Sequence, residues 1–378
     1  MRQKSQRLKK NEKNGTCSKS KKTNNSFAPI LNTLISILLK KHFKTIVKAA
    51  LISVYVIFLA GSIVRMTGSG MGCPDWPKCF GYYIPPSDEA ELLWQPNKLY
   101  SKGMMIIQNE SLFVAEENFT SSDTFKKDHW QTYTKHDYAV FNVYHTWTEY
   151  INRLASVISG LIFLLLIYTS LKFRKENKIL VYLSFVAFLG MLFEAWLGKT
   201  VIDSVLKPST ITIHMVVGLL IIGVLLKLLH LLSTKEERLI RYNKTFQYLL
   251  LISVAFSIIQ IAMGTQVRQF VDEQVKLFGF ENKQMSLYNP SIVFYIHRSF
   301  TIAIVLVNLL IFYKNETLKL NFKLPKYIVG LIIVEALTGI LMYYSDFPIG
   351  TQAIHLVCGA LLFGMQFYLV LQNKYATN

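Results

Sequence analysis

Eight long apolar stretches, separated by polar connections, divide the chain. They lie near residues 45–65, 150–171, 178–199, 211–232, 247–267, 293–313, 326–344 and 351–372. A run of about 20 apolar residues is long enough to cross the hydrocarbon core of a bilayer as an α-helix. The pattern therefore predicts an all-α integral membrane protein with eight transmembrane helices.

Short motifs recur in the same order in the first and second sets of four stretches. Residues 61–65 resemble 264–268, 150–153 resemble 295–298, 194–198 resemble 335–339, and 213–218 resemble 354–359. Each match is weak alone, but four ordered matches, one per stretch, indicate a duplicated unit. We therefore expect two pseudo-symmetric four-helix bundles, over residues 45–232 and 245–372.

Composition and charge support a membrane location. Hydrophobic residues make up 52% of the chain, and the mean hydropathy is +0.31. The net charge of +18 is unevenly placed, with thirteen Lys or Arg and one acidic residue in residues 1–48. The loops near 172–178, 233–244 and 314–326 are also basic and fall on the same side of the membrane. The positive-inside rule makes that side cytoplasmic. We expect a multi-pass membrane protein with both termini cytoplasmic, whose basic segments contact lipid rather than nucleic acid.

The polar segments at the start of the chain differ in character. Residues 1–44 form a predicted basic cytoplasmic tail, in which 30–39 could lie along the membrane surface as an amphipathic helix. The first outside loop, 67–144, is large enough for a small lid but shows no clear strand pattern. It contains Cys73 and Cys79, for which a disulfide is the leading interpretation. Such a disulfide is either a staple or redox-active.

Histidines within the apolar stretches are the main candidates for a site, because an ionisable side chain is costly in lipid and usually functional. His297 and His355 occupy equivalent depths in the second set, and two facing imidazoles are typical ligands of haem iron. In the first set His214 is present, but the partner position holds Asn152. Alternatively, each histidine makes only an interhelical hydrogen bond. Zinc or copper is less favoured, since no short-spaced His or Cys set accompanies them.

Four arginines lie near the outer ends of the helices: Arg65, Arg153, Arg268 and Arg298. A haem brings two propionates that need cationic partners, and these arginines are candidates for that role. The alternative is that they only extend toward lipid headgroups, as any terminal arginine can.

His145, Glu149 and Asn152 follow at helical spacing and form one stripe. A carboxylate in a first helical turn is favoured by the helix dipole alone. Beside a haem, however, Glu149 could take protons or stabilise developing positive charge. The second half has no matching glutamate, which suggests chemistry in the first half and a fixed cofactor in the second. For Glu194 and Glu335, matched acids of the two halves, we expect a structural role.

These motifs resemble the haem A synthase family, the Cox15 and CtaA proteins, and the chain is similar to its bacterial members. The resemblance is carried by residues 61–70, 73–79, 149–153, 264–268, 296–298 and 354–355, so it extends from the first span to the last. It implies oxidation of a methyl group of haem O to a formyl group, which gives haem A for cytochrome oxidase. It also implies a substrate haem in the N-terminal bundle and a permanent haem b in the C-terminal one.

The resemblance implies that His297 and His355 ligate haem b, that His214 belongs to the substrate site, and that Glu149 is the catalytic carboxylate. The family usually has a histidine where this chain has Asn152. Either His145 ligates the substrate haem from the same face, or the sixth position is open. Haem O synthase and cytochrome oxidase assembly factors are the expected partners, together with a possible second copy of the chain.

Two other functions compete with this one. A two-haem electron carrier or quinol oxidase of cytochrome b type would keep paired ligands in both halves and would not need Glu149. A haem or porphyrin transporter would use the duplicated bundles for alternating access. Against the transporter, the candidate ligands lie in the outer half of the membrane rather than at its midplane.

Overall fold

The computed structural model describes residues 27–134, 141–204, 206–233, 242–279 and 282–375. The chain divides into a first unit that ends at Lys41 and a second unit that begins at His42. In the first unit the backbone from Phe27 onward is helical. The remainder of the predicted basic tail, residues 1–26, lies outside the described residues.

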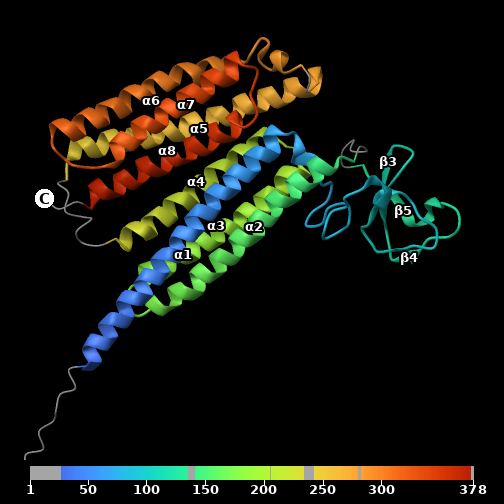
Figure 1. Ribbon diagram of the computed structural model, residues 1–378, viewed down its shortest axis with the longest axis horizontal. Helices are drawn as coiled ribbons and strands as arrows, with labels where there is room; N and C mark the ends of the chain where they lie inside the picture. Colours follow the sequence, from blue (N-terminus) through green and yellow to red (C-terminus); the bar gives the residue numbers. More distant parts are fainter. Residues whose placement is uncertain (1–26, 135–140, 205, 234–241, 280–281, 376–378) are drawn as a thin grey trace, which may run out of the picture. The chain divides into compact units, whose positions relative to one another are not determined.

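Eight helices in the described part of the chain are long and apolar enough to cross a membrane, which confirms the predicted class. They are α1 (Phe27–Met66), α2 (Val143–Ser170), α3 (Lys178–Asp203), α4 (Pro208–Leu231), α5 (Lys244–Phe278), α6 (Ile292–Thr317), α7 (Leu324–Tyr344) and α8 (Thr351–Lys374). Figure 1 shows α5–α8 packed side by side, and α2–α4 packed with the part of α1 that follows His42.

Two helices extend beyond the apolar pattern. Helix α1 begins at Phe27, so residues 30–39, expected as a possible surface helix, are helical and belong to it. Helix α5 continues past the expected end at residue 267 as far as Phe278. Residues 268–278 contain neither Gly nor Pro, and Gly279, with φ 85°, ends the helix.

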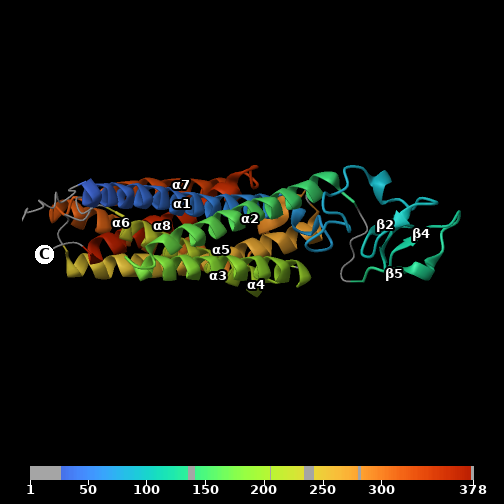
Figure 2. The same ribbon diagram turned by 90° about the horizontal axis from the view of Figure 1, so that it is seen from below.

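Helices α4 and α8 join the two bundles. Helix α4 packs against α3, α5 and α8, and α8 packs against α5 and α7 as well. The view in Figure 2 shows the same helices from a second direction. The contact faces are apolar, with Leu219 and Ile222 of α4 and Leu369 of α8 fully buried. The outer faces are also apolar, as lipid requires: Leu161, Leu220 and Ile302 are all more than half exposed.

Buried polar side chains link three helices of the C-terminal bundle. Asn308 of α6 accepts hydrogen bonds from Ser253 of α5 (3.0 Å) and from the side-chain amide of Gln366 of α8 (3.2 Å). Gln366 accepts a further hydrogen bond from Ser257 of α5 (2.7 Å). In lipid such groups must be satisfied within the protein, so this network fixes the register of the three helices.

The segment between α1 and α2 contains a small β-structure, which the sequence pattern did not predict. Its strands are β1 (Leu99–Tyr100), β2 (Met105–Gln108), β3 (Ser111–Ala115), β4 (Phe119–Thr120) and β5 (Trp130–Thr132). Strands β1 and β4 pair, and β2, β3 and β5 form a second antiparallel sheet. Tyr100, Ile106, Ala115 and Trp130 form one small core. This segment is therefore a folded domain that brings its own hydrophobic interior.

We expect Phe246→Ala to destabilise the C-terminal bundle. Phe246 is fully buried and stacks on Phe322, with ring centroids 5.5 Å apart. The loss should lie near the low end of the about 3–5 kcal/mol seen for such truncations, because lipid rather than water surrounds the bundle. Thermal unfolding in detergent measures it. Leu251→Ala, on the exposed face of the same helix, is the matched control, and an equal effect of both variants would contradict the prediction.

Candidate functional site

The even-numbered helices α2, α4, α6 and α8 all begin at the same end of the bundles. Their first turns carry Glu149 and Asn152 (α2), His214 (α4), His297 (α6) and His355 (α8). The structure brings His297 and His355 together, with ring centroids 6.5 Å apart and ring planes inclined by 68°. The other three residues lie in the N-terminal bundle.

His355 is held by two side chains of the neighbouring helix α7. Its Nδ1 lies 3.0 Å from a carboxyl oxygen of Glu335 and 2.9 Å from the hydroxyl of Thr338. A proton on Nδ1 is satisfied by these acceptors, which leaves Nε2 with a free lone pair. A metal-binding histidine is usually held in this way.

His297 lies across from His355 and is held mainly through its backbone. Its carbonyl accepts a hydrogen bond from the side-chain amide of Gln260 (2.9 Å). Its buried Nδ1 has no hydrogen-bond partner among the described residues. The Cβ of an alanine at 264 would lie 3.3 Å from the imidazole, so Gly264 leaves space beside the ring. A buried ring nitrogen without a hydrogen-bond partner among the described residues is suited to a ligand.

A cavity of about 400 Å³ surrounds this histidine pair. Helices α5–α8 supply most of the wall, with Ser62 and Arg65 of α1 and Met215 of α4 completing it. The lining is predominantly apolar, with a few polar groups such as Gln260 and Gln352 whose side-chain oxygens are unpartnered within the described ranges. An apolar cavity with two convergent imidazoles fits a large flat cofactor such as haem.

Three of the predicted arginines line this cavity, namely Arg65, Arg268 and Arg298. Arg65 and Arg268 both bind the carboxylate of Asp272, each at 2.6 Å. Arg268 also donates to the backbone carbonyl of Arg65 (2.7 Å). Arg298 lies over the ring of Tyr343, 5.2 Å from its centroid. The rim thus holds three arginine side chains and the carboxylate of Asp272. This carboxylate binds Arg65 of the N-terminal bundle and Arg268 of the C-terminal bundle, so it joins the two bundles.

The N-terminal bundle contains a corresponding but incomplete arrangement. His214 of α4 contacts the carboxylate of Glu194 of α3 through Nδ1. Asn152 of α2 has a buried side-chain oxygen with no hydrogen-bond partner in the described part of the chain. The Cβ of an alanine at 61 would lie 3.9 Å from that oxygen, so Gly61 stands beside Asn152 as Gly264 stands beside His297. His145 lies two turns before Asn152, in the first turn of α2.

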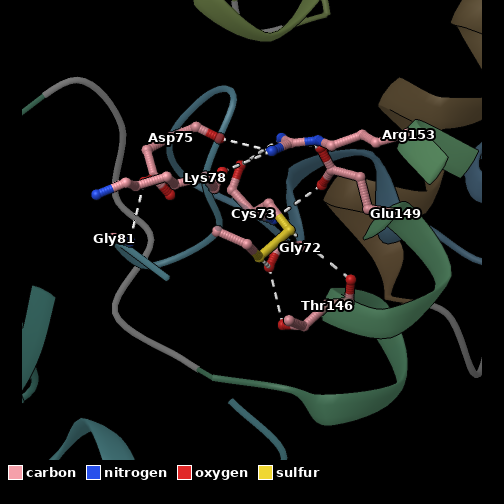
Figure 3. Close-up of a disulfide and its surroundings, with 9 residues drawn as sticks. Gly72, Cys73, Asp75, Lys78, Gly81, Thr146, Glu149 and Arg153 are labelled. Atoms are coloured by element: carbon pink, nitrogen blue, oxygen red, sulfur yellow. Dashed lines mark hydrogen bonds and ion pairs between the residues drawn. A yellow bond between two sulfur atoms is a disulfide. The ribbon is translucent and has the colours of Figure 1, made fainter. Parts of the chain in front are cut away.

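Glu149 is buried and binds the disulfide loop, as Figure 3 shows. One carboxylate oxygen accepts the backbone N–H of Cys73 (2.8 Å), and the other accepts from Arg153 (2.6 Å). Arg153 also donates to the backbone carbonyls of Asp75 and Lys78, each at 2.7 Å. Arg153, a candidate cofactor arginine, thus binds the loop, and it is not among the residues that line the cavity around His297 and His355.

The loop itself is closed by a disulfide between Cys73 and Cys79, as predicted. Thr146 of α2 donates to the backbone carbonyl of Gly72 (2.8 Å), one residue before the first cysteine. Burial raises the pKa of the Asp75 carboxyl, although the N–H of Gly81 (2.9 Å) and the nearby charge of Arg153 act in the opposite direction. The loop is thus fixed to α2 by at least three side chains.

Comparison with known proteins assigns the chain to a family. A family model described as COX15-CtaA, cytochrome oxidase assembly protein, matches residues 44–119 and 114–367. The chain belongs to the COX15-CtaA family. A Wolbachia pipientis wMel protein named heme A synthase is 24% identical over 345 residues, which cover 84% of this chain and 89% of that protein. An Ehrlichia canis protein of the same name is 26% identical over 347 residues, with the same coverage.

In this COX15-CtaA chain, sequence reasoning missed two parts of the site. Asp272 was placed in a loop, because the apolar pattern stops at residue 267, but it lies on the extension of α5. Glu194 and Glu335 were treated as structural acids, yet each contacts a candidate ligand histidine. Their identical 20-residue spacing to His214 and His355 was the signal that could have shown this. No group of three or more His, Cys, Asp or Glu side chains in the described ranges could hold a metal ion.

We expect Gly72→Ala to displace the disulfide loop from α2. A Cβ at this position would lie 2.4 Å from the backbone oxygen of His145, so the loop must move and its bonds to Thr146 and Glu149 break. The predicted loss of stability is about 2 kcal/mol or more, measured by thermal unfolding, with faster proteolysis between α1 and α2. Gly70→Ala is the control, because a Cβ there makes only ordinary contacts with Leu206. Equal proteolysis of both variants would contradict the prediction.

Proposed function

We propose that this protein is a haem A synthase, which oxidises a methyl group of haem O to a formyl group. The family match and the relatives named heme A synthase, which align along 84% of the chain, support this activity. Among the structural features, the buried pair of His297 and His355 in one cavity carries the proposal furthest. An electron-transferring haem in one half would serve the oxidation of a second haem in the other.

In the C-terminal bundle, His297 and His355 are the residues that would hold haem b. The unpartnered Nδ1 of His297, the space beside Gly264 and the apolar wall all fit this cofactor. When bound, a haem with two imidazole ligands supplies one-electron exchange at its iron. Arg65, Arg268 and Arg298 place positive charge at the cavity rim, where carboxylates of a haem would be stabilised.

In the N-terminal bundle, His214 is the residue that would hold the substrate haem O, with Asn152 at the opposing position. Conversion of a methyl to a formyl group with water as the source of the oxygen atom releases protons, together with electrons that an acceptor must take up, so a proton acceptor is needed close to the reacting carbon. Glu149, one helical turn from Asn152, is the proposed acceptor. Arg153 and the N–H of Cys73 hold its two oxygens in place and stabilise the carboxylate form.

The test is co-expression with a haem O synthase in a host that lacks its own haem A, followed by haem extraction and mass spectrometry. We expect haem A from the wild type and at least about a hundredfold less from Glu149→Gln, within the range for loss of a general base. The glutamine keeps an acceptor for the Cys73 N–H, and Thr146 still donates to the carbonyl of Gly72, so two bonds from the loop to α2 remain. Glu116→Ala, an exposed acid of the β-domain, is the control with wild-type yield.

Other outcomes of that experiment separate the competing functions. Haem b alone in both the wild type and the Glu149 variant would overturn the synthase and favour a two-haem electron carrier. Wild-type haem A from Glu149→Gln would leave the synthase but remove Glu149 from its chemistry. Glu149→Ala adds a structural measure, since it also removes the bonds that Glu149 makes to the Cys73 N–H and to the Arg153 side chain.

Asn152→His should change the spin state of the N-terminal haem. With His214 as the one imidazole ligand, the iron of bound haem O is expected to be high-spin, and a second imidazole from α2 should make it low-spin. Electron paramagnetic resonance of protein loaded with haem O measures the change. His145→Ala should leave the wild-type spectrum unaltered; loss of a low-spin signal in that variant would show instead that His145 is the second ligand.

The membrane setting of the proposal follows from charge. Basic residues cluster in the connections between α2 and α3 and between α6 and α7, which lie at the end opposite the candidate sites. By the positive-inside rule the sites then lie at the outer half of a bacterial inner membrane, with both termini in the cytoplasm. Haem O synthase and cytochrome oxidase assembly factors are the proposed partners, as donor of the substrate and acceptors of the product.

A further inference from the structure

The same carboxyl–imidazole contact occurs once in each half of the molecule. In the C-terminal half Glu335 of α7 contacts Nδ1 of His355 of α8, at 3.0 Å. In the N-terminal half Glu194 of α3 contacts Nδ1 of His214 of α4. Both pairs have the same 20-residue spacing and lie on successive helices of the repeat. The contact is thus present at matching positions of both halves, although most other residues differ between them.

Each carboxyl group fixes one ring nitrogen and so determines what the other can do. A proton held on Nδ1 by the carboxyl oxygen leaves Nε2 as the nitrogen with a free lone pair. The contact also prevents the ring from turning. Carboxyl partners of this kind orient metal-binding histidines and raise their basicity, and removing them typically costs about 10–100-fold in metal affinity.

The opposing position of each half has no such support. Nδ1 of His297 and the side-chain oxygen of Asn152 are buried and have neither a hydrogen bond nor a carboxylate contact among the described residues, whereas Nδ1 of His214, which also lacks a hydrogen bond there, contacts the carboxylate of Glu194. A glycine of the repeat, Gly264 or Gly61, lies beside each of them. The matching positions on α4 and α8 therefore both hold a histidine that contacts a carboxylate. The matching positions on α2 and α6 hold different residues, Asn152 and His297.

We propose that Glu194 and Glu335 are positioning residues that orient His214 and His355, the histidines that would hold a haem in each half. This inference rests on the proposed function in that each half binds a haem. The halves differ in one respect: Thr338 gives His355 a second acceptor at 2.9 Å, and the matching residue of α3 is Leu197. His214 consequently depends on Glu194 alone, and truncating Glu194 should have the larger effect.

The test compares Glu335→Leu with Glu335→Gln in full-length protein purified with its haem b. The leucine removes the acceptor, whereas the glutamine retains an oxygen that can accept from Nδ1. We expect Glu335→Leu to lose haem to an excess of a haem-scavenging protein about 10–100-fold faster. We also expect its iron to favour the reduced state about tenfold more, which for one electron is about 59 mV. Glu335→Gln should stay within about threefold of the wild type in haem loss.

A matched control separates positioning from packing. Gln366→Leu removes a fully buried polar side chain from the same bundle, one that contacts Ser257 and Asn308 but neither histidine. It should lower thermal stability but leave the reduction potential of the bound haem unchanged. If the leucine variant does not accumulate, Glu335→Asp serves in its place, because a side chain shorter by one methylene moves the carboxylate away from Nδ1 of His355. We expect it to shift the reduction potential of the bound haem in the same direction, by a smaller amount.

The inference is overturned if the leucine and aspartate variants keep the haem retention and the potential of the wild type. It is also overturned if Gln366→Leu shifts the potential as much as Glu335→Leu does, since packing alone would then explain the effect. The parallel comparison of Glu194→Leu with Glu194→Gln, loaded with haem O, should show a larger loss than at Glu335. A wild type that binds no haem would instead contradict the proposed function.

Discussion

Inside the hydrocarbon of a bilayer, a carboxyl group or an imidazole has no water to bind and must find its partner within the protein. That constraint determines much of this structure. Glu335 and Glu194 contact histidines, Asn308 and Gln366 bind serines and one another, and Glu149 binds a backbone N–H and an arginine. Among the described residues, some buried groups lack such partners, and those of Gln260, His297, Glu335 and Gln352 line the cavity of the C-terminal bundle.

The contact between Glu149 and the disulfide loop joins two parts of the molecule that have different surroundings. The segment between α1 and α2 contains the β-domain, which has a core of its own. Helix α2 itself carries Glu149 and Asn152 of the proposed N-terminal site. Arg153 and Glu149 bridge them, because the arginine binds loop carbonyls and the carboxylate together. The position of the proposed proton acceptor therefore depends on the fold of the loop. A substitution in the loop can therefore move the Glu149 carboxylate, even though Glu149 itself is unchanged.

The sequence predicted the parts of the fold that follow from periodicity and repetition. Eight apolar runs gave eight helices, and the matched histidines led correctly to the pairing of His297 with His355. It did not predict the β-hairpin of residues 105–115, because the turn at Asn109 and Glu110 adopts positive φ without a glycine to signal it. The bond of Arg153 to loop carbonyls was not predicted, because it depends on a tertiary contact that no local pattern encodes. Asp272 was missed because an amphipathic helical extension resembles a polar loop.

The bridge from Arg65 through Asp272 to Arg268 has a consequence for how the chain is made. Arg65 ends the first span, whereas its carboxylate partner lies 207 residues later, near the end of the fifth. During synthesis four spans enter the membrane before that partner exists. Until then the guanidinium of Arg65 has only water and lipid headgroups at the interface as partners. It binds Asp272 and becomes part of the rim only after α5 has inserted. The rim of the C-terminal cavity, which includes a residue of the first helix, is therefore among the last features of the protein to be completed.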